Sequence, residues 1–145
     1  KKEIFKLSNG KFIAPQVIEN MFKESAIIDQ IMVVGEHEKF ASAIISPDFK
    51  YFAELRQANK ISFSDPGELI RLPEIISIFN SEIEKINKRL GAHERINRFR
   101  LVPDEWSPVT GEISPTLKLR RQFISNKYKE IIDQIYMNQP ARVSL

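Results

Sequence analysis

Two apolar runs separated by a short polar segment constrain the fold of this chain more than any other feature. The runs cover residues 27–34 and 40–45, and Gly35-Glu36-His37-Glu38-Lys39 lies between them. Short continuous apolar runs are typical of buried strands, and a polar segment of this length that contains glycine is typical of a hairpin loop. The sequence therefore predicts a hairpin of two buried strands.

The remaining elements surround this hairpin. Strand-like segments flank the turn residues Ser8-Asn9-Gly10, and Pro15 stands where a first helical turn tolerates it. Their apolar spacing predicts the further elements in this order: helices over 15–25, 48–59 and 73–90, a strand over 96–102, a loop over 103–115, and a helix over 119–136. This order predicts an α+β fold: a small mixed sheet with a hairpin, flanked by amphipathic helices, in a single compact domain.

Several residues carry local predictions. Val17, Ile18, Met21 and Phe22 define the apolar face of the first helix. Three further predictions concern single positions or stretches, namely a left-handed C-terminal helix cap at Gly91, a loop anchor at Trp106, and an inner face of the last helix formed by Ile124, Tyr128, Ile131, Ile132 and Ile135.

The composition excludes several classes of function. The chain has 145 residues, no cysteine and two histidines, which excludes disulfide scaffolds, thiolate zinc sites and all-histidine metal sites. We interpret His37 and His93 as surface residues. The net charge of +3 is dispersed and no nucleic-acid motif is present, so we expect no nucleic-acid partner. No apolar run approaches the roughly 20 residues of a membrane-spanning helix.

Two segments carry a resemblance to a known family. KEIFKLSNGKFIAPQVIEN (residues 2–20) resembles the hinge-side motif of AMP-forming long-chain fatty acid–CoA ligases, and SPTLKLRR (residues 114–121) resembles their last core motif. IMVVG (residues 31–35) and FASAIISP (residues 40–47) fit the strands expected between the two motifs. The resemblance covers nearly the whole chain, with both motifs in the family's order.

The resemblance implies that residues 1–145 are the mobile C-terminal domain of such a ligase, cut from a longer protein after its hinge. The N-terminal adenylation domain would bind ATP, Mg²⁺ and the fatty acid, while the isolated C-terminal domain would bind no cofactor and be inactive. Lys118 occupies the position of the lysine that assists acyl-adenylate formation. Ser8, Asn9, Gly10 and Lys11 occupy the loop that faces the active site when CoA forms the thioester. The full enzyme is expected to be cytoplasmic, and peripheral association with a membrane is left open.

One departure and one alternative remain open. Many adenylate-forming enzymes carry glycine before the motif lysine, where this chain has Leu117, a feature that resembles the long-chain branch. Arg120 and Arg121 begin the last predicted helix, where we expect them to pair with acidic residues and to matter less than Lys118. The alternative function is a non-catalytic module that docks an anionic or protein partner through a basic face.

Overall fold

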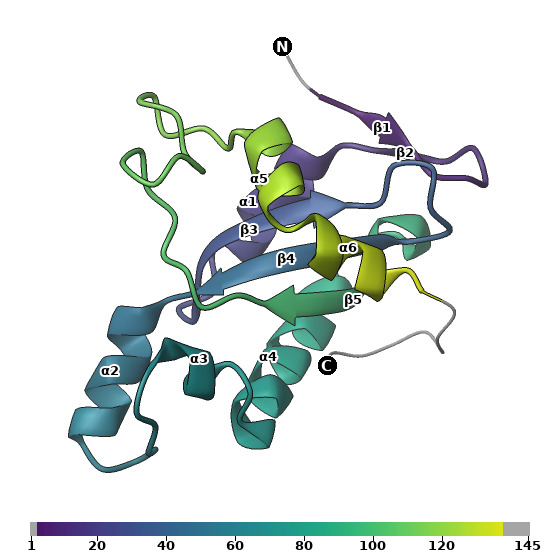
Figure 1. The fold of residues 1–145 in the computed structure, drawn as a ribbon. Helices are drawn as coiled ribbons and strands as arrows, with labels where there is room; N and C mark the ends of the chain where they lie inside the picture. The colour runs from purple at the N-terminus through teal and green to yellow at the C-terminus, as the bar shows by residue number, and fades with distance from the viewer. Residues whose placement is uncertain (1–2, 138–145) are drawn as a thin grey trace.

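A computed structural model describes residues 3–137 and contains a three-stranded mixed sheet at its centre (Figure 1). The strands are β3 (Ile28–Val34), β4 (Ala41–Pro47) and β5 (Ile96–Leu101), in the order β3-β4-β5. β3 and β4 are antiparallel and joined by the predicted loop, while β4 and β5 run parallel. The α+β class and the small mixed sheet predicted from the sequence are confirmed.

The sheet is buried on both faces, which explains the continuous apolar runs of its strands. Alternate side chains of β3 belong to two separate cores: Ile31 and Val33 to one, Met32 and Val34 to the other. The first core also contains the apolar faces of α1 (Pro15–Phe22), α2 (Phe49–Gln57) and α4 (Pro73–Asn87). The second lies beneath α5 (Arg121–Lys127) and α6 (Lys129–Ile135), which cover the opposite face (Figure 1).

The helices on the first face follow the predicted pattern with two differences. A further short helix, α3 (Pro66–Leu69), forms between α2 and α4, where no helix was predicted, and the Asp65 carboxylate caps it by accepting a hydrogen bond from the Glu68 amide at 2.9 Å. In α1, Ile18 and Phe22 are buried as predicted. Val17 is instead 47% exposed, so its assignment to the inner face was wrong.

Two predictions about helix ends were also wrong. Gly91 has φ −65° and ψ 159°, so it is extended, and it precedes the short 3₁₀ helix η1 (Ala92–Glu94) instead of closing α4 in a left-handed cap. The helix predicted over 119–136 is divided between α5 and α6 at Tyr128, which has φ −110° and ψ 26°. Its inner face is otherwise confirmed, since Ile124, Tyr128 and Ile135 are buried.

The first hairpin is small and is held by the loop of the larger one. β1 (Phe5–Lys6) and β2 (Phe12–Ile13) pair antiparallel in a sheet of their own. The His37 amide donates to the Lys6 carbonyl at 2.9 Å, and the Ser8 amide donates to the Glu38 carbonyl at 2.8 Å. The predicted hairpin around Ser8-Asn9-Gly10 is confirmed, and backbone hydrogen bonds fix its position on the domain.

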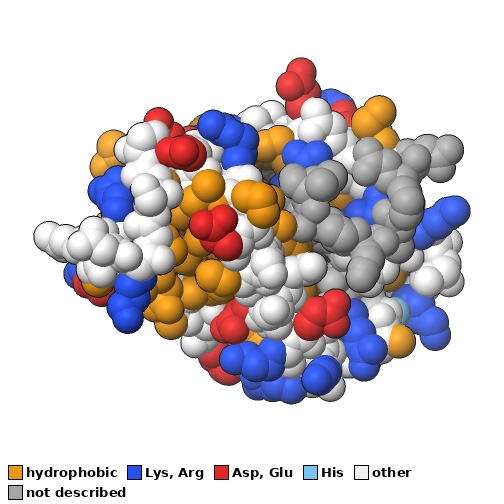
Figure 2. Space-filling model, turned by 90° about the horizontal axis from the view of Figure 1, so that it is seen from below, with side chains coloured by type: hydrophobic (Ala, Val, Ile, Leu, Met, Phe, Trp, Pro, Cys, Tyr) orange, Lys and Arg blue, Asp and Glu red, His pale blue; other side chains and the backbone are white. Residues whose placement is uncertain are grey.

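The surface carries charges of both signs. On the face shown in Figure 2, lysine and arginine side chains lie beside aspartate and glutamate side chains, around an area of exposed hydrophobic side chains. No helix among residues 3–137 is long and apolar enough to cross a membrane.

Candidate functional site

The loop that contains Gly10 is a tight turn with one left-handed residue. The Gly10 amide donates to the Leu7 carbonyl at 2.9 Å, and the Leu7 amide donates to the Lys11 carbonyl at 2.8 Å. Gly10 has φ +90°, a backbone conformation that glycine adopts without steric cost. The Asn9 side chain accepts from the Lys11 amide at 3.0 Å. This is a three-residue hairpin loop whose last residue is left-handed, a common arrangement.

The loop that contains Lys118 has the same hydrogen bonds. The Leu117 amide donates to the Ser114 carbonyl at 2.8 Å, and the Ser114 amide donates to the Lys118 carbonyl at 2.7 Å. Leu117 has φ +65°, so a leucine occupies the left-handed position that Gly10 occupies in the first loop. The Ser114 hydroxyl accepts from the Lys118 amide at 3.1 Å, and Ile113 pairs with Leu119 beyond the turn.

The two loops present their lysines in equivalent positions at opposite ends of the domain. Figure 1 shows residues 7–11 at one edge of the molecule, and residues 114–118 at the other edge, beside the start of α5. Lys11 and Lys118 each follow the left-handed residue, and both are exposed. Within residues 3–137, neither ammonium group forms an ion pair or a hydrogen bond. Each is therefore available to a ligand or to another protein surface.

A buried carboxylate supports the Lys118 loop. Glu112 is fully buried, and its two carboxylate oxygens accept from the Lys127 ammonium at 2.6 Å and from the Thr110 hydroxyl at 2.5 Å. Its carbonyl accepts from the Arg120 amide at 2.8 Å, across the base of the loop. Burial alone would raise the pKa of Glu112, but these side-chain hydrogen bonds lower it below its ordinary value. The loop is thus fixed to α5 by a charged contact.

Trp106 anchors the preceding loop as predicted. It is 4% exposed, and its indole N–H donates to the Tyr128 hydroxyl at 3.1 Å. The Tyr128 hydroxyl donates in turn to the Asp104 carboxylate at 2.6 Å. Burial and this carboxylate raise the pKa of Tyr128 well above its ordinary range, so the hydroxyl remains a donor. These contacts hold Tyr128 at the junction between α5 and α6.

Arg121 joins the start of α5 to the first helix and to the beginning of the chain. Its guanidinium donates two hydrogen bonds of 2.7 Å to the Glu19 carboxylate and lies 2.5 Å from a Glu3 carboxylate oxygen. Glu19 is buried and also accepts from the Val33 amide of β3 at 2.8 Å. Burial alone would lower the pKa of Arg121, but the two carboxylates raise it above its ordinary value.

The pairing of Arg121 with acidic residues is therefore confirmed, whereas Arg120 donates to the Gly111 carbonyl at 2.9 Å. Sequence reasoning missed Glu19, although a signal was present. The buried face of α1 contains Pro15, Ile18, Glu19 and Phe22, at the spacing of one helical stripe. A carboxylate inside an apolar stripe requires a partner, because an unpaired buried charge is costly.

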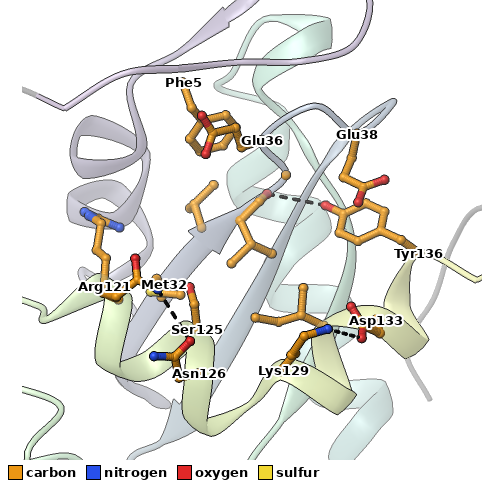
Figure 3. A pocket seen from close by; sticks show the side chains of 15 residues that line it. Phe5, Met32, Glu36, Glu38, Arg121, Ser125, Asn126, Lys129, Asp133 and Tyr136 are labelled. Carbon is orange, nitrogen blue, oxygen red and sulfur yellow. Dashed lines mark hydrogen bonds and ion pairs between the residues drawn. The ribbon is translucent and has the colours of Figure 1, made fainter.

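A recess lies between the β3–β4 loop and the α5–α6 pair (Figure 3). It has a volume of about 440 Å³, an apolar floor that includes Met32 and Val34, and a polar rim. Arg121 lies at the end nearest α1, while Asp133 and Tyr136 lie at the other. No residue predicted from the sequence to act in catalysis lines this recess.

Comparison with known proteins identifies the family. The family model described as the AMP-binding enzyme C-terminal domain matches residues 2–140. The chain belongs to this family. Long-chain-fatty-acid–CoA ligase FadD15 of Mycobacterium tuberculosis is 32% identical to this C-terminal domain over 137 residues, which are 94% of this chain and 23% of that protein. Long-chain-fatty-acid–CoA ligase 1 of Cavia porcellus is 33% identical over 140 residues, which are 94% of this chain and 20% of that protein.

Solved structures share the fold of this C-terminal domain. The didomain of a carboxylic acid reductase from Segniliparus rugosus, in complex with AMP, superposes with a TM-score of 0.73 at 22% identity, over 93% of this chain and 17% of that one. The adenylation domain of a carboxylate reductase from Mycobacterium chelonae gives a TM-score of 0.74 at 18% identity, over 93% and 19% of the two chains. The resemblance to long-chain ligases that was stated from the two motifs is confirmed. The chain spans about a fifth of the length of the two ligases named above.

The described part of this C-terminal domain offers no candidate metal centre. Among residues 3–137, no three histidine, aspartate or glutamate side chains gather where they could hold a metal ion. His37 is 80% exposed on its loop, as predicted for a surface residue.

Proposed function

We propose that this domain is part of a long-chain fatty acid–CoA ligase that converts acid, ATP and CoA into acyl-CoA, AMP and diphosphate through an acyl-adenylate. The observation that carries the proposal is Lys118, an exposed lysine without a partner among the described residues, on a loop that is fixed on both sides. Relatives that are about 32% identical to this chain are named as long-chain-fatty-acid–CoA ligases. The N-terminal adenylation domain of the same protein is the partner that this proposal requires.

In the first half-reaction, Lys118 stabilises the transition state of carboxylate attack on ATP. The attack brings two anions together and spreads negative charge over the phosphorus centre. A fixed cation stabilises this arrangement more than it stabilises the separated reactants. Lysine suits the role because its ammonium is a compact charge on a long, flexible stem. Because hydrogen bonds already hold the backbone of the loop, it is mainly the Lys118 side chain that has to be ordered when the domain docks.

In the second half-reaction, the domain turns so that Ser8, Asn9, Gly10 and Lys11 face the active site. The two loops lie at opposite ends of the domain, so a single rigid body cannot place both against one site at once (Figure 1). Rotation of the domain removes Lys118 and opens the path that the CoA thiol needs. Conformational steps of this kind often limit the rate of turnover.

The proposal assigns the cofactors to the other domain. ATP, Mg²⁺ and the fatty acid bind there, and CoA enters between the two domains. Within residues 3–137, this domain contributes the Lys118 cation and the Gly10 loop, and its carboxylates are not arranged as a metal site. We therefore expect the 145-residue chain alone to fold without making acyl-CoA. Diphosphate exchange by this chain with ATP and a fatty acid would contradict the assignment.

The decisive test is Lys118→Ala in the full-length enzyme. ATP–diphosphate exchange measures the first half-reaction, and consumption of preformed acyl-adenylate by CoA measures the second. We expect loss of exchange with the second half-reaction largely retained. Near-normal exchange would mean that Lys118 is an ordinary solvent-exposed lysine without a role in the first half-reaction. The alternative, a basic docking module, predicts instead a gradual loss of affinity across several basic residues, and the mixed charges of the surface in Figure 2 give it less support.

A further inference from the structure

Lys118 shares a recess with two carboxylates. The recess has a volume of about 170 Å³, and its lining includes Lys118, Arg121, Glu3 and Glu19. Both carboxylates are bound by Arg121, and Glu19 is 5% exposed whereas Glu3 is 63% exposed. Lys23 also lines the recess, but its ammonium donates to the Gln30 side chain at 3.3 Å. Lys118, which the proposed reaction needs, thus lines the same recess as two carboxylates that already form ion pairs with Arg121.

The shape of Arg121 allows it to serve both carboxylates at once. A guanidinium has five N–H donors in a planar fork, and here two of its edges are used: the two terminal nitrogens contact Glu19, and Nε contacts Glu3. A lysine at this position could neutralise only one of them well. If the fork were absent, the Glu3 carboxylate would be free on the rim of the recess. The flexible stem of Lys118 would then let its ammonium pair with Glu3.

We propose that Arg121 is a positioning residue for Lys118. By occupying Glu3 and Glu19, it prevents a competing ion pair inside the domain and leaves the Lys118 ammonium available for the reacting phosphate and carboxylate. The inference rests on the proposed function for its catalytic consequence. The availability of Lys118 can be measured without any reaction.

The test has to separate this role from the contribution of Arg121 to folding. Removing Arg121 alone leaves the buried Glu19 charge unpaired, which destabilises a protein strongly. The variant is therefore Arg121→Gln combined with Glu19→Gln, which removes the buried pair together and releases Glu3. The matched rescue adds Glu3→Gln, a change at an exposed side chain. A second, milder variant is Arg121→Lys, which keeps a positive charge beside Glu19 but cannot also bind Glu3 well.

The first measurement is acetylation of the 145-residue chain by an N-hydroxysuccinimide ester, followed by peptide mass spectrometry. Lys11, at the other end of the domain, is the internal standard. We expect the acetylation rate of Lys118 relative to Lys11 to fall about two- to fivefold in the double variant, the range that an exposed ion pair supports. Adding Glu3→Gln should restore the ratio. Arg121→Lys should give a smaller decrease, also reversed by Glu3→Gln.

The second measurement is diphosphate exchange in the full-length enzyme with the same variants. We expect exchange to fall by a similar factor and to recover with Glu3→Gln, whatever the change in melting temperature. A fall in exchange that Glu3→Gln does not reverse would assign Arg121 a structural role only and overturn the inference. An unchanged Lys118 acetylation ratio in both variants would also overturn it. Neither result bears on the proposed function, which is tested separately by diphosphate exchange in the Lys118→Ala variant.

Discussion

The Gly10 loop and the Lys118 loop have the same backbone hydrogen bonds but are held on the domain in different ways. Backbone groups hold the first, through the Ser8 amide and the Glu38 carbonyl. Charged side chains hold the second, through the buried carboxylate of Glu112 and the fork of Arg121. The comparison shows that the same turn geometry can be supported by contacts that differ in their sensitivity to pH. Protonation should loosen the Lys118 loop and leave the Gly10 loop unchanged.

The largest expected difference between the loops is catalytic. In the full-length enzyme, Lys118→Ala should lower diphosphate exchange by ~10²–10³, the usual effect of losing one well-placed charge contact in a transition state. Lys11→Ala, the matched change in the equivalent turn position, should leave exchange within about threefold, as a surface charge does. Exchange rates of both variants, measured at saturating ATP and fatty acid, check the prediction. Equal losses would mean that neither lysine has a specific role in the first step.

The sequence predicts most of the fold because the strand and helix signals are local. The runs at 27–34 and 40–45 are buried on both sides of the sheet, so their pattern needs no knowledge of partners. One of the errors lies at a residue that makes a contact distant in the sequence. The last helix divides at Tyr128, and the Tyr128 hydroxyl donates to Asp104, 24 residues earlier. A helical pattern of apolar residues continues through such a junction without change.

The candidate site divides in the same way. The positions of Gly10 and Lys118 follow from motifs that can be read along the chain. The fork of Arg121 joins residues 102 positions apart, and no local pattern pairs Arg121 with Glu19. The left-handed conformation of Leu117 was also hidden, because leucine rarely adopts it. The hydrogen bonds shared with the Gly10 loop reveal this conformation only once the structure is known.

The second prediction tests how the Lys118 loop is held. The pKa of Glu112 is lowered below its ordinary value of 4.5, so its ionised form stabilises the folded state. This contribution is present above about pH 4.5 and is lost as pH falls through the lower, folded-state pKa. Glu112→Gln should cost about 2 kcal/mol at pH 6, as expected for hydrogen bonds to a charged group. The difference from the unsubstituted chain should shrink toward pH 3, as measured by urea unfolding.

Hydrogen exchange at single amides localises this effect. The Leu117 amide donates to the Ser114 carbonyl in the Lys118 loop. After correction for intrinsic exchange rates, this amide should lose more protection between pH 6 and pH 3 than the Gly10 amide does. A constant stability difference between Glu112→Gln and the unsubstituted chain across this range would contradict the proposed support. Equal loss of protection at both amides would contradict the comparison between the loops.

The third prediction concerns the size of the left-handed residue in the first loop. A Cβ atom at Gly10 would meet no other atom within 4 Å, so a side chain there causes backbone strain without a clash. Gly10→Ala and Gly10→Leu should therefore lose similar stability, about 1–2 kcal/mol. If the loop faces the thiol path, only Gly10→Leu should also slow consumption of preformed acyl-adenylate by CoA. Single-turnover measurements on the full-length enzyme distinguish the two variants, and equal rates would reduce Gly10 to a turn residue.

The smallest effect is expected at the equivalent position of the second loop. Leu117 has φ +65° and is 74% exposed, so its side chain contributes strain but little burial. Leu117→Gly relieves about 1–2 kcal/mol of strain and costs about 0.5–1 kcal/mol in the entropy of the unfolded chain. The net expectation is a stabilisation of about 0.5–1 kcal/mol, measured by urea unfolding of the 145-residue chain. Leu117→Asn is the control, because asparagine tolerates this conformation without the added flexibility of glycine, and it should also stabilise the fold. Destabilisation by both changes would show that the exposed leucine makes a contact worth more than the strain, and the two turns would then differ in packing as well as in charge.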